Sequence, residues 1–166
     1  MTAAGTAEAS AWRSSGPAGY EVSTDPGRLD IGRIHHFLSR AYWSPGIPRD
    51  VVERAIAHSL PFGLYAPSGE QVGFARAITD CATYAWLADV YVESAHRGHG
   101  LGKFLVASVL SHPDLQGLRR CALATADAHG LYAQYGFGPP AHPTRHMCIE
   151  RTPAELWPAE TQPSSP

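Results

Sequence analysis

The sequence predicts a single α/β (α+β) domain built on a central mixed, mostly antiparallel sheet of about six to seven strands, flanked by about four helices. Three observations predict this class. The chain has 166 residues, the size of one ordinary domain. Hydrophobic residues make up 44% of the chain and charged residues 17%, so a core can form. Segments with helical spacing of apolar residues precede a run of strand-like segments joined by short turns.

Both ends of the chain differ in composition from its middle. Residues 1–19 are small and polar, and Trp12 is their only large apolar side chain, so burial cannot repay the entropy of ordering them. Residues 152–166 contain four prolines and little that could form a core. We therefore expect a disordered N-terminal tail over 1–19, a folded domain over 20–151 and a flexible, Pro-rich C-terminal tail over 152–166.

Apolar spacing predicts two helices after one short strand. Within residues 29–42, Ile31, Ile34 and Leu38 recur at helical intervals. Pro48 stands at a helix-start position before a second such pattern. The next segments, 62–65, 72–78 and 84–92, are rich in β-branched and aromatic residues and are separated by tight connections. We expect them to form an antiparallel meander.

The last third of the domain alternates between the two element types. Residues 101–110 carry apolar side chains on one helical face, residues 121–125 are typical of a strand, and residues 128–135 of a short helix. A final strand is expected around residues 146–150. The predicted order is therefore β-α-α-β-β-β-α-β-α-β.

Composition excludes several classes of function. The formal net charge is −2, which gives no indication of a nucleic acid or an anionic membrane as partner. Cys81, Cys121 and Cys148 are odd in number and widely spaced, which argues against a disulfide framework and favours a reducing compartment. No apolar run approaches the roughly 18 residues of a membrane span, and the N-terminus lacks the layout of a signal peptide. A cytoplasmic protein is expected.

The most informative segment joins the strand 84–92 to the helix 101–110. Gly98, Gly100 and Gly102 lie there between Arg97 and Lys103. Glycines let the backbone approach a ligand closely, and the first turn of a helix exposes N–H groups at the positive end of its dipole. With the two flanking cations, this glycine bend predicts a pocket for a phosphate or pyrophosphate. A turn that only packs the helix on the sheet is the alternative.

Two other phosphate-binding motifs do not fit these residues. A Walker loop requires glycine where Arg97 stands and a hydroxyl residue where Phe104 stands. The dinucleotide fingerprint requires a third glycine where Lys103 stands, and a meander precedes the bend instead of a βαβ unit.

Residues 97–102 read Arg-Gly-His-Gly-Leu-Gly, and residues 128–137 read Ala-His-Gly-Leu-Tyr-Ala-Gln-Tyr-Gly-Phe. The first resembles the Arg/Gln-x-x-Gly-x-Gly/Ala motif of the GNAT superfamily of acyl-CoA-dependent N-acetyltransferases. The second resembles that family's Ala-x-x-Phe-Tyr-x-x-x-Gly-Phe segment. Their order and separation, on a matching order of elements, extend the resemblance to residues 20–151. Residues 123–132 are also similar to an uncharacterised bacterial subgroup of the family.

The resemblance implies a GNAT sheet that splays at a β-bulge and binds acetyl-CoA (coenzyme A). The strand 90–92 would pair with the pantetheine arm, and N–H groups of the glycine bend would hold the pyrophosphate. Thr125 stands where relatives often have an asparagine that contacts the pantetheine, and His129 is expected near the cofactor. The implied cofactor-binding residues are Val90, Tyr91, Val92, Arg97, Gly98, His99, Gly100, Gly102, Lys103, Thr125, His129 and Tyr132.

Acetyl transfer to an amine requires a neutral nucleophile, a stabilised oxyanion and a proton for the leaving thiolate. The resemblance places Tyr132 beside the thioester sulfur, where a phenol with a pKa of about 10 can donate that proton; a core tyrosine is the alternative. The resemblance also implies that the N–H of Val90 or of its neighbour polarises the thioester carbonyl. The base stays open, because relatives often carry an acidic residue where this chain has Ala88. Asp89 and Asp80 are the candidates, and a turn cap or an ion pair is an equal expectation for each.

The acceptor is expected to bind between the loop that joins the first two helices and the later strands. Aromatic and acidic side chains gather there, which favours a cationic or aromatic amine, although aromatic loop residues often only cover a core. The candidate acceptor residues are Tyr42, Trp43, Asp80, Tyr84 and Trp86. No metal is expected, because Pro143 opposes the helix that would align His142 with His146.

We therefore expect an N-acetyltransferase that uses acetyl-CoA and acts on a primary amine of a small molecule or peptide, by direct attack in a ternary complex. None of the three cysteines has a recognisable histidine partner, so no covalent intermediate is expected. The alternative is a non-catalytic acyl-CoA-binding regulatory module of the same fold. Monomer and homodimer both stay open, as does the identity of the amine.

Overall fold

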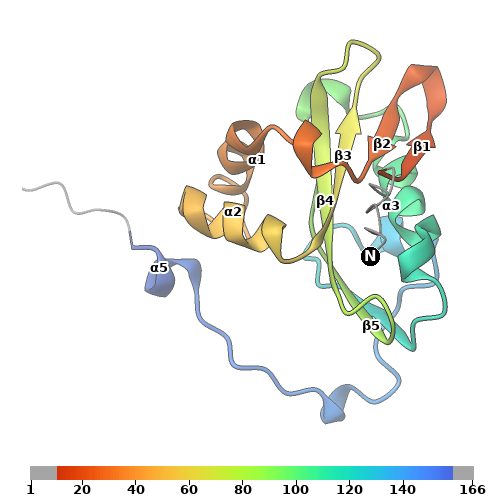
Figure 1. Cartoon of the computed structure of the whole chain (residues 1–166). Coiled ribbons are helices and arrows are strands. Elements are labelled where there is room, and N and C mark those ends of the chain that lie inside the picture. The colour runs from red at the N-terminus through yellow and green to blue at the C-terminus, as the bar shows by residue number, and fades with distance from the viewer. Residues whose placement is uncertain (1–10, 159–166) are drawn as a thin grey trace, which may run out of the picture.

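The computed structural model describes residues 11–158 and shows a six-stranded sheet with helices on both faces (Figure 1). The strands lie in chain order, and each neighbouring pair is antiparallel except β5 and β6, which are parallel. The predicted mixed, mostly antiparallel sheet is confirmed. The strands are β1 (Arg13–Ser15), β2 (Glu21–Ser23), β3 (Leu60–Tyr65), β4 (Gln71–Thr79), β5 (Tyr84–Val92) and β6 (Arg120–Ala122).

Two helices cover each face of the sheet. On one face, α1 (Ile31–Leu38) and α2 (Arg49–Ala57) bury apolar side chains against Phe74 and Tyr91. On the other face, α3 (Leu101–Ser111) and α4 (His129–Ala133) pack against β3, β4 and β5. The sheet is therefore buried on both sides, which explains why β4 carries a nearly continuous apolar run instead of an alternating one.

The strand predicted at 84–92 and the helix predicted at 101–110 are confirmed with bounds that agree within one residue. The first helix is shorter than its apolar spacing predicted. It ends at Leu38, whose carbonyl accepts a hydrogen bond from the hydroxyl of Ser44 at 2.8 Å, and the chain then turns toward Gly46. Tyr42 consequently lies on a loop instead of a helix.

The N-terminal tail predicted over residues 1–19 is wrong for the described part, residues 11–19. β1 pairs with β2, and the indole of Trp12 makes edge contacts with Phe62 and His112 at ring-centroid distances of 6.3 and 5.1 Å. One large aromatic side chain on the core, together with a strand pair, is enough to order these few residues. Residues 1–10 lie outside the described residues.

The C-terminal region also departs from the prediction. No strand forms at residues 146–150, because the chain leaves the sheet after α4 and brings these residues beside no other strand (Figure 1). The tail predicted over 152–166 begins with a short helix, α5 (Pro153–Leu156), in which Thr152 and Glu155 form a reciprocal capping box. Residues 159–166 lie outside the described residues.

An ionic cluster fixes α1 against the end of β5. The guanidinium of Arg33 donates to Glu93 at 2.6 Å and to Glu70 at 2.6 Å. These carboxylates raise the pKa of Arg33 above its ordinary value. Glu93 directly follows β5, so the cluster holds the start of the glycine bend to the helix layer on the opposite face. Among the described residues, no helix is long and apolar enough to cross a membrane.

We expect Trp12→Ala to lower the free energy of unfolding by about 1–3 kcal/mol, because a half-buried tryptophan loses its contacts with Phe62 and His112. Chemical denaturation monitored by circular dichroism measures this change. Trp12→Phe is the matched control and should recover much of the loss. Unchanged stability in Trp12→Ala would show that residues 11–15 contribute nothing to the fold.

Candidate active site

β5 and β6 part from one another halfway along β5. The two strands pair only at Tyr84 with Arg120, Ala85 with Cys121, and Trp86 with Ala122. β6 ends there, whereas β5 continues to Val92. Within the described residues, the β6 side of β5 therefore has no strand neighbour from Leu87 onward. The backbone groups along this open edge are free to bind another extended chain.

A β-bulge in β5 lies at this open edge. Tyr91 pairs with Phe74 and Ala88 with Arg76, so two residues of β5, Asp89 and Val90, stand opposite the single residue Ala75. Asp89 has a φ of 55°, in the left-handed region that few non-glycine residues adopt. The extra residue interrupts the ladder and bends the strand, which agrees with the β-bulge that the family resemblance implied for the sheet.

Contacts from two other elements hold Asp89 in this conformation. One carboxylate oxygen accepts from Nε of Arg76 at 2.5 Å, and the other accepts from the indole N–H of Trp43 at 3.2 Å. The side chains of Asp89 and Arg76 are only 13% and 16% exposed. Asp89 thus joins the bulge to the loop between α1 and α2. Because both of its oxygens are engaged, it is badly placed to take a proton from a substrate.

The glycine bend leads from β5 to an uncapped helix N-terminus. Gly98 and Gly100 have φ values of 82° and 73°, and Gly100 begins α3 without a side-chain cap. A Cβ atom at either glycine would meet nothing within 4 Å, so the surface beside them is open. Arg97 donates to the carbonyl of Val92 at 2.9 Å, and Lys103 lies exposed on the first turn of α3. Free N–H groups, a helix dipole and two cations make this bend suitable for a phosphate group.

A cleft of about 930 Å³ lies beside the bulge, between the α1–α2 loop, β4, β5 and the start of α4, and no residue of the glycine bend lines it. Tyr132 of α4 lines it with only 8% of its surface exposed, and burial raises the pKa of its phenol. Thr125 lines the cleft too, and its hydroxyl accepts from the N–H of Ala128 at 3.0 Å. The predicted residues that the structure brings to this cleft are Tyr42, Trp43, Trp86, Asp89, Val90, Thr125 and Tyr132.

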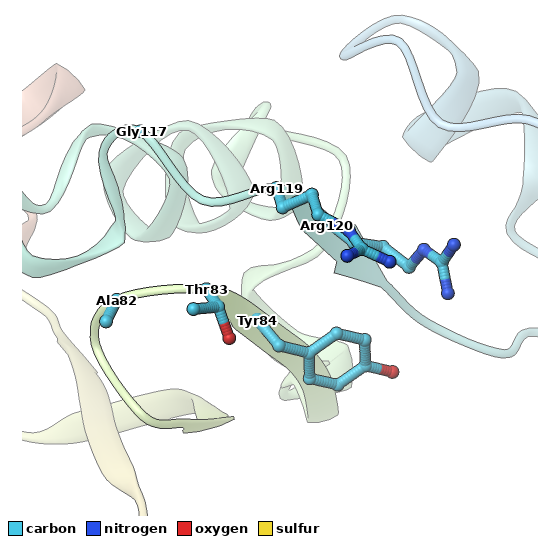
Figure 2. A pocket seen from close by; sticks show the side chains of 6 residues that line it. All are labelled: Ala82, Thr83, Tyr84, Gly117, Arg119 and Arg120. Carbon is cyan, nitrogen blue, oxygen red and sulfur yellow. The ribbon is translucent and has the colours of Figure 1, made fainter.

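Asp80 and Tyr84 lie elsewhere. Both stand at the opposite end of β5 from the bulge, about 16 Å away at about 3.3 Å per residue. Tyr84 borders a separate hollow with Arg119 and Arg120 (Figure 2). Asp80 accepts hydrogen bonds from three backbone N–H groups and the hydroxyl of Thr83, which hold the pKa of its carboxyl well below its ordinary range. Asp80 is a turn cap, and the structure corrects its assignment as base and acceptor residue.

Three other predicted residues do not line the cleft. The ring of Tyr91 stacks on Phe37 at 3.7 Å inside the core, so only its backbone could reach the open edge. His129 is exposed at the start of α4. His99 is exposed in the bend, where its ring nitrogen lies 3.3 Å from the carbonyl oxygen of His96.

Sequence reasoning missed four charged or aromatic residues that line the cleft: Arg76, Asp127, Glu150 and Trp157. Arg76 carried a usable signal, because it is the one charged residue within the apolar strand 72–78. A charge buried in a sheet needs a partner, and Asp89 is that partner here. Trp157 carried no signal that could place it in this cleft.

Neither a metal centre nor a nucleophilic cysteine forms among residues 11–158. No group of three or more potential metal ligands gathers in this part of the chain. The three cysteines are free, and burial raises the pKa of Cys121, which favours the unreactive thiol. Cys81 and Cys148 are exposed.

Comparison with known proteins identifies the family of this chain. A family model for the GNAT acetyltransferase domain matches residues 58–139, which include β4, β5, α3 and α4. A candidate acetyltransferase of the GNAT family from Xanthomonas campestris pv. campestris has a crystal structure that is similar to this one. The two chains are 52% identical with a TM-score of 0.80, and the match covers 84% of this chain and 97% of that one.

Two curated relatives are more distant. A candidate acetyltransferase of Gibberella zeae is 34% identical over 137 residues, which cover 69% of this chain and 76% of that protein. Chloroplastic serotonin N-acetyltransferase 2 of Oryza sativa subsp. japonica is 28% identical over 146 residues, covering 83% of this chain and 71% of that protein. Together with the open edge of β5 and the glycine bend, these similarities show that the chain belongs to the GNAT family of N-acetyltransferases.

Proposed function

We propose that this protein transfers the acetyl group of acetyl-CoA to a primary amine by direct attack within the cleft. One observation carries the proposal. The open edge of β5 leads through the glycine bend to the uncapped N-terminus of α3, and Tyr132 lines the cleft beside that edge. An extended pantetheine arm matches the unpaired backbone of a strand edge, and a pyrophosphate matches the N–H groups of the bend. The residues present therefore fit coenzyme A.

Two groups of this chain would act on the reacting atoms. The N–H of Val90, which the bulge removes from the regular ladder, would donate to the thioester carbonyl oxygen as negative charge develops there. Tyr132 would protonate the departing thiolate. Its raised pKa keeps the phenol protonated at neutral pH, as a general acid requires. The alternative function is a non-catalytic acyl-CoA-binding module. It would give no chemical role to the phenol of Tyr132, which lines the cleft.

Asp89 would position the acceptor site instead of removing a proton. Its two oxygens hold Arg76 and Trp43, so the carboxylate fixes the wall of the cleft on which the amine would lie. Water in the open cleft would take up the proton that the amine releases. Trp43, Trp86 and Trp157 supply aromatic faces there, with acidic side chains nearby. This lining favours an aromatic or cationic amine over an anionic one.

Gly102→Glu should abolish coenzyme A binding while preserving the fold. A Cβ at Gly102 would meet only Leu131 at 3.8 Å, an ordinary contact, and a carboxylate suits the first turn of a helix. The same carboxylate would repel the pyrophosphate. Wild type should gain roughly 5–10 °C in melting temperature at 100 times the dissociation constant, since such saturation stabilises by about 2.7 kcal/mol.

The control for this experiment is Ala107→Glu, which adds the same charge to an exposed position of α3 away from the bend. It should keep the full thermal shift. A folded Gly102→Glu variant that also keeps the shift would exclude the bend as the pyrophosphate site.

Tyr132→Phe should lower kcat by about 10²–10⁴-fold and leave acetyl-CoA binding unchanged, because the substitution removes only the proton donor. Since the pKa of Tyr132 is raised, wild-type kcat should show no basic limb from this group below about pH 10. Release of free thiol at saturating amine measures both effects. Tyr135→Phe is the control: its hydroxyl donates to the carbonyl of Lys103 at 2.8 Å, so kcat should stay near the wild-type value. Full kcat in Tyr132→Phe, with chemistry rate-limiting, would assign the proton to solvent.

Asp89→Asn should raise KM for the amine several-fold without moving the acidic limb of the pH–rate profile. Asparagine tolerates a positive φ, so the bulge should persist while the ion pair with Arg76 is lost. Asp127→Asn, at another carboxylate of the cleft, is the comparison. Disappearance of the acidic limb in Asp89→Asn would identify this residue as the general base and contradict the positioning role.

A further inference from the structure

A short turn near the N-terminus contacts the glycine bend on both of its flanks. This turn, residues 16–20, joins β1 to β2, and we call it the N-terminal turn. Two backbone hydrogen bonds close it: the N–H of Gly16 donates to the carbonyl of Tyr20 at 2.8 Å, and the N–H of Tyr20 donates to the carbonyl of Pro17 at 3.0 Å. Gly16 and Tyr20 are half-buried, whereas residues 17–19 are exposed. The two ends of the turn are therefore packed more closely than its middle.

On the side where the chain enters the bend, Tyr20 contacts His96. The hydroxyl oxygen of Tyr20 lies 2.8 Å from ring Nδ1 of His96, and the two rings meet edge to face with their centroids 5.9 Å apart. His96 ends the short 3₁₀ helix Ser94–His96, which directly precedes Arg97. This hydrogen bond is partly buried and joins residues 76 positions apart in the chain, so it ties the entrance of the bend to a distant segment.

On the side where the chain leaves the bend, Gly16 packs on Phe104. A Cβ atom at Gly16 would overlap the ring of Phe104. The φ of Gly16 is −114°, which any residue adopts, so its backbone conformation does not require glycine. The N–H of Phe104 donates to the carbonyl of Gly100 at 3.0 Å, at the start of α3. The close approach of the ring therefore accounts for the glycine, and the N-terminal turn lies directly against the beginning of this helix.

Between these two contacts the bend has little packing of its own. Arg97 and His99 are exposed, and Gly98 and Gly100 have positive φ values with open space beside them. Glycines leave a chain many alternative conformations, so the flanks must supply much of the order of the bend. Its N–H groups converge on one phosphate only while His96 and the start of α3 keep a fixed separation. The N-terminal turn spans that separation as one closed unit.

We propose that the N-terminal turn positions the glycine bend for coenzyme A, with Tyr20 and Gly16 as the positioning residues. This inference rests on the proposed function, because it concerns the same pyrophosphate site. Tyr20 acts through His96, and Gly16 acts through Phe104. When only a fraction of the free protein has the binding conformation, the apparent dissociation constant rises by the inverse of that fraction. Contacts that hold both flanks raise this fraction and so tighten binding.

Tyr20→Phe should raise the Kd of coenzyme A roughly 3- to 10-fold, the factor that corresponds to the net contribution of one hydrogen bond. Isothermal titration calorimetry measures this change. Tyr65→Phe is the matched control and should keep the wild-type Kd, because the buried hydroxyl of Tyr65 has no hydrogen-bond partner among the described residues. Absence of coenzyme A binding in wild type would overturn the proposed function together with this inference. Wild-type affinity in Tyr20→Phe would overturn the inference alone.

Pantetheine separates an effect on the bend from a general loosening of the fold, because it lacks the pyrophosphate of coenzyme A. Its Kd should be the same in wild type and Tyr20→Phe, since the open edge of β5 lies outside the N-terminal turn and the bend. Equal weakening of coenzyme A and pantetheine would contradict the positioning role.

The partner of Tyr20 offers a test by rescue. His96→Ala should weaken coenzyme A binding about as much as Tyr20→Phe, whereas the side-chain oxygen of His96→Asn can accept in place of Nδ1 and should restore most of the affinity. In Tyr20→Phe/His96→Ala the two losses should not add, because both substitutions remove the same hydrogen bond. Fully additive losses, or equal affinities of the His96→Ala and His96→Asn variants, would contradict the role of this contact.

Gly16→Ala should also raise the Kd of coenzyme A several-fold, because the added methyl group displaces the ring of Phe104 at the start of α3. Gly138→Ala is the matched control, since a Cβ there would meet nothing within 4 Å. Circular dichroism establishes that both variants fold. Wild-type affinity in folded Gly16→Ala would show that the contact with Phe104 does not position the bend.

Discussion

The site depends on one extra residue in β5. In a regular ladder with β4, each residue of β5 would face one residue of β4. Asp89 breaks this regularity by adopting a left-handed conformation, which costs of order 1 kcal/mol or more for a residue with a side chain. The ion pair with Arg76 and the hydrogen bond from Trp43 offset that cost. A strained backbone is thus held by contacts from β4 and from the α1–α2 loop.

The two halves of the proposed coenzyme A site are positioned by different means. The thioester end rests on the sheet itself, because the open edge and the bulge belong to β5. The phosphate end rests on α3, whose first turn is held near β5 by the ionic cluster of Arg33 and by the return of Arg97 onto Val92. Tyr132 belongs to the same buried core cluster as Leu101 and Leu105 of α3, which holds α4 against that helix. Rigid elements therefore carry each group proposed to touch coenzyme A.

The sequence predicted most of the sheet and the position of the glycine bend, because both are encoded locally. The strand 84–92 and the glycines of the bend lie within 20 consecutive residues, where period and backbone freedom can be read directly. The acceptor half depends on contacts distant in the chain, such as Trp43 with Asp89. Asp80 was misassigned for this reason. The sequence alone does not distinguish an aspartate that caps a tight turn from one that faces a cleft, and only the fold separates the two cases. The order of residues 11–15 was missed because their average composition is typical of a flexible tail. The single ring of Trp12 nevertheless packs on the core.

Residues 146–150 show a different limit of prediction from sequence patterns. Alternation in residues 146–150 indicates a strand with one apolar face, yet it carries no information about which edge that face meets. In the single chain the expected strand is absent, while the features that predicted it, alternating side chains and an unpaired backbone, are all present and exposed. Glu150 stands at the end of this segment and Trp157 directly follows α5, and both line the cleft. The segment whose pairing the pattern leaves open therefore also supplies part of the lining of the cleft.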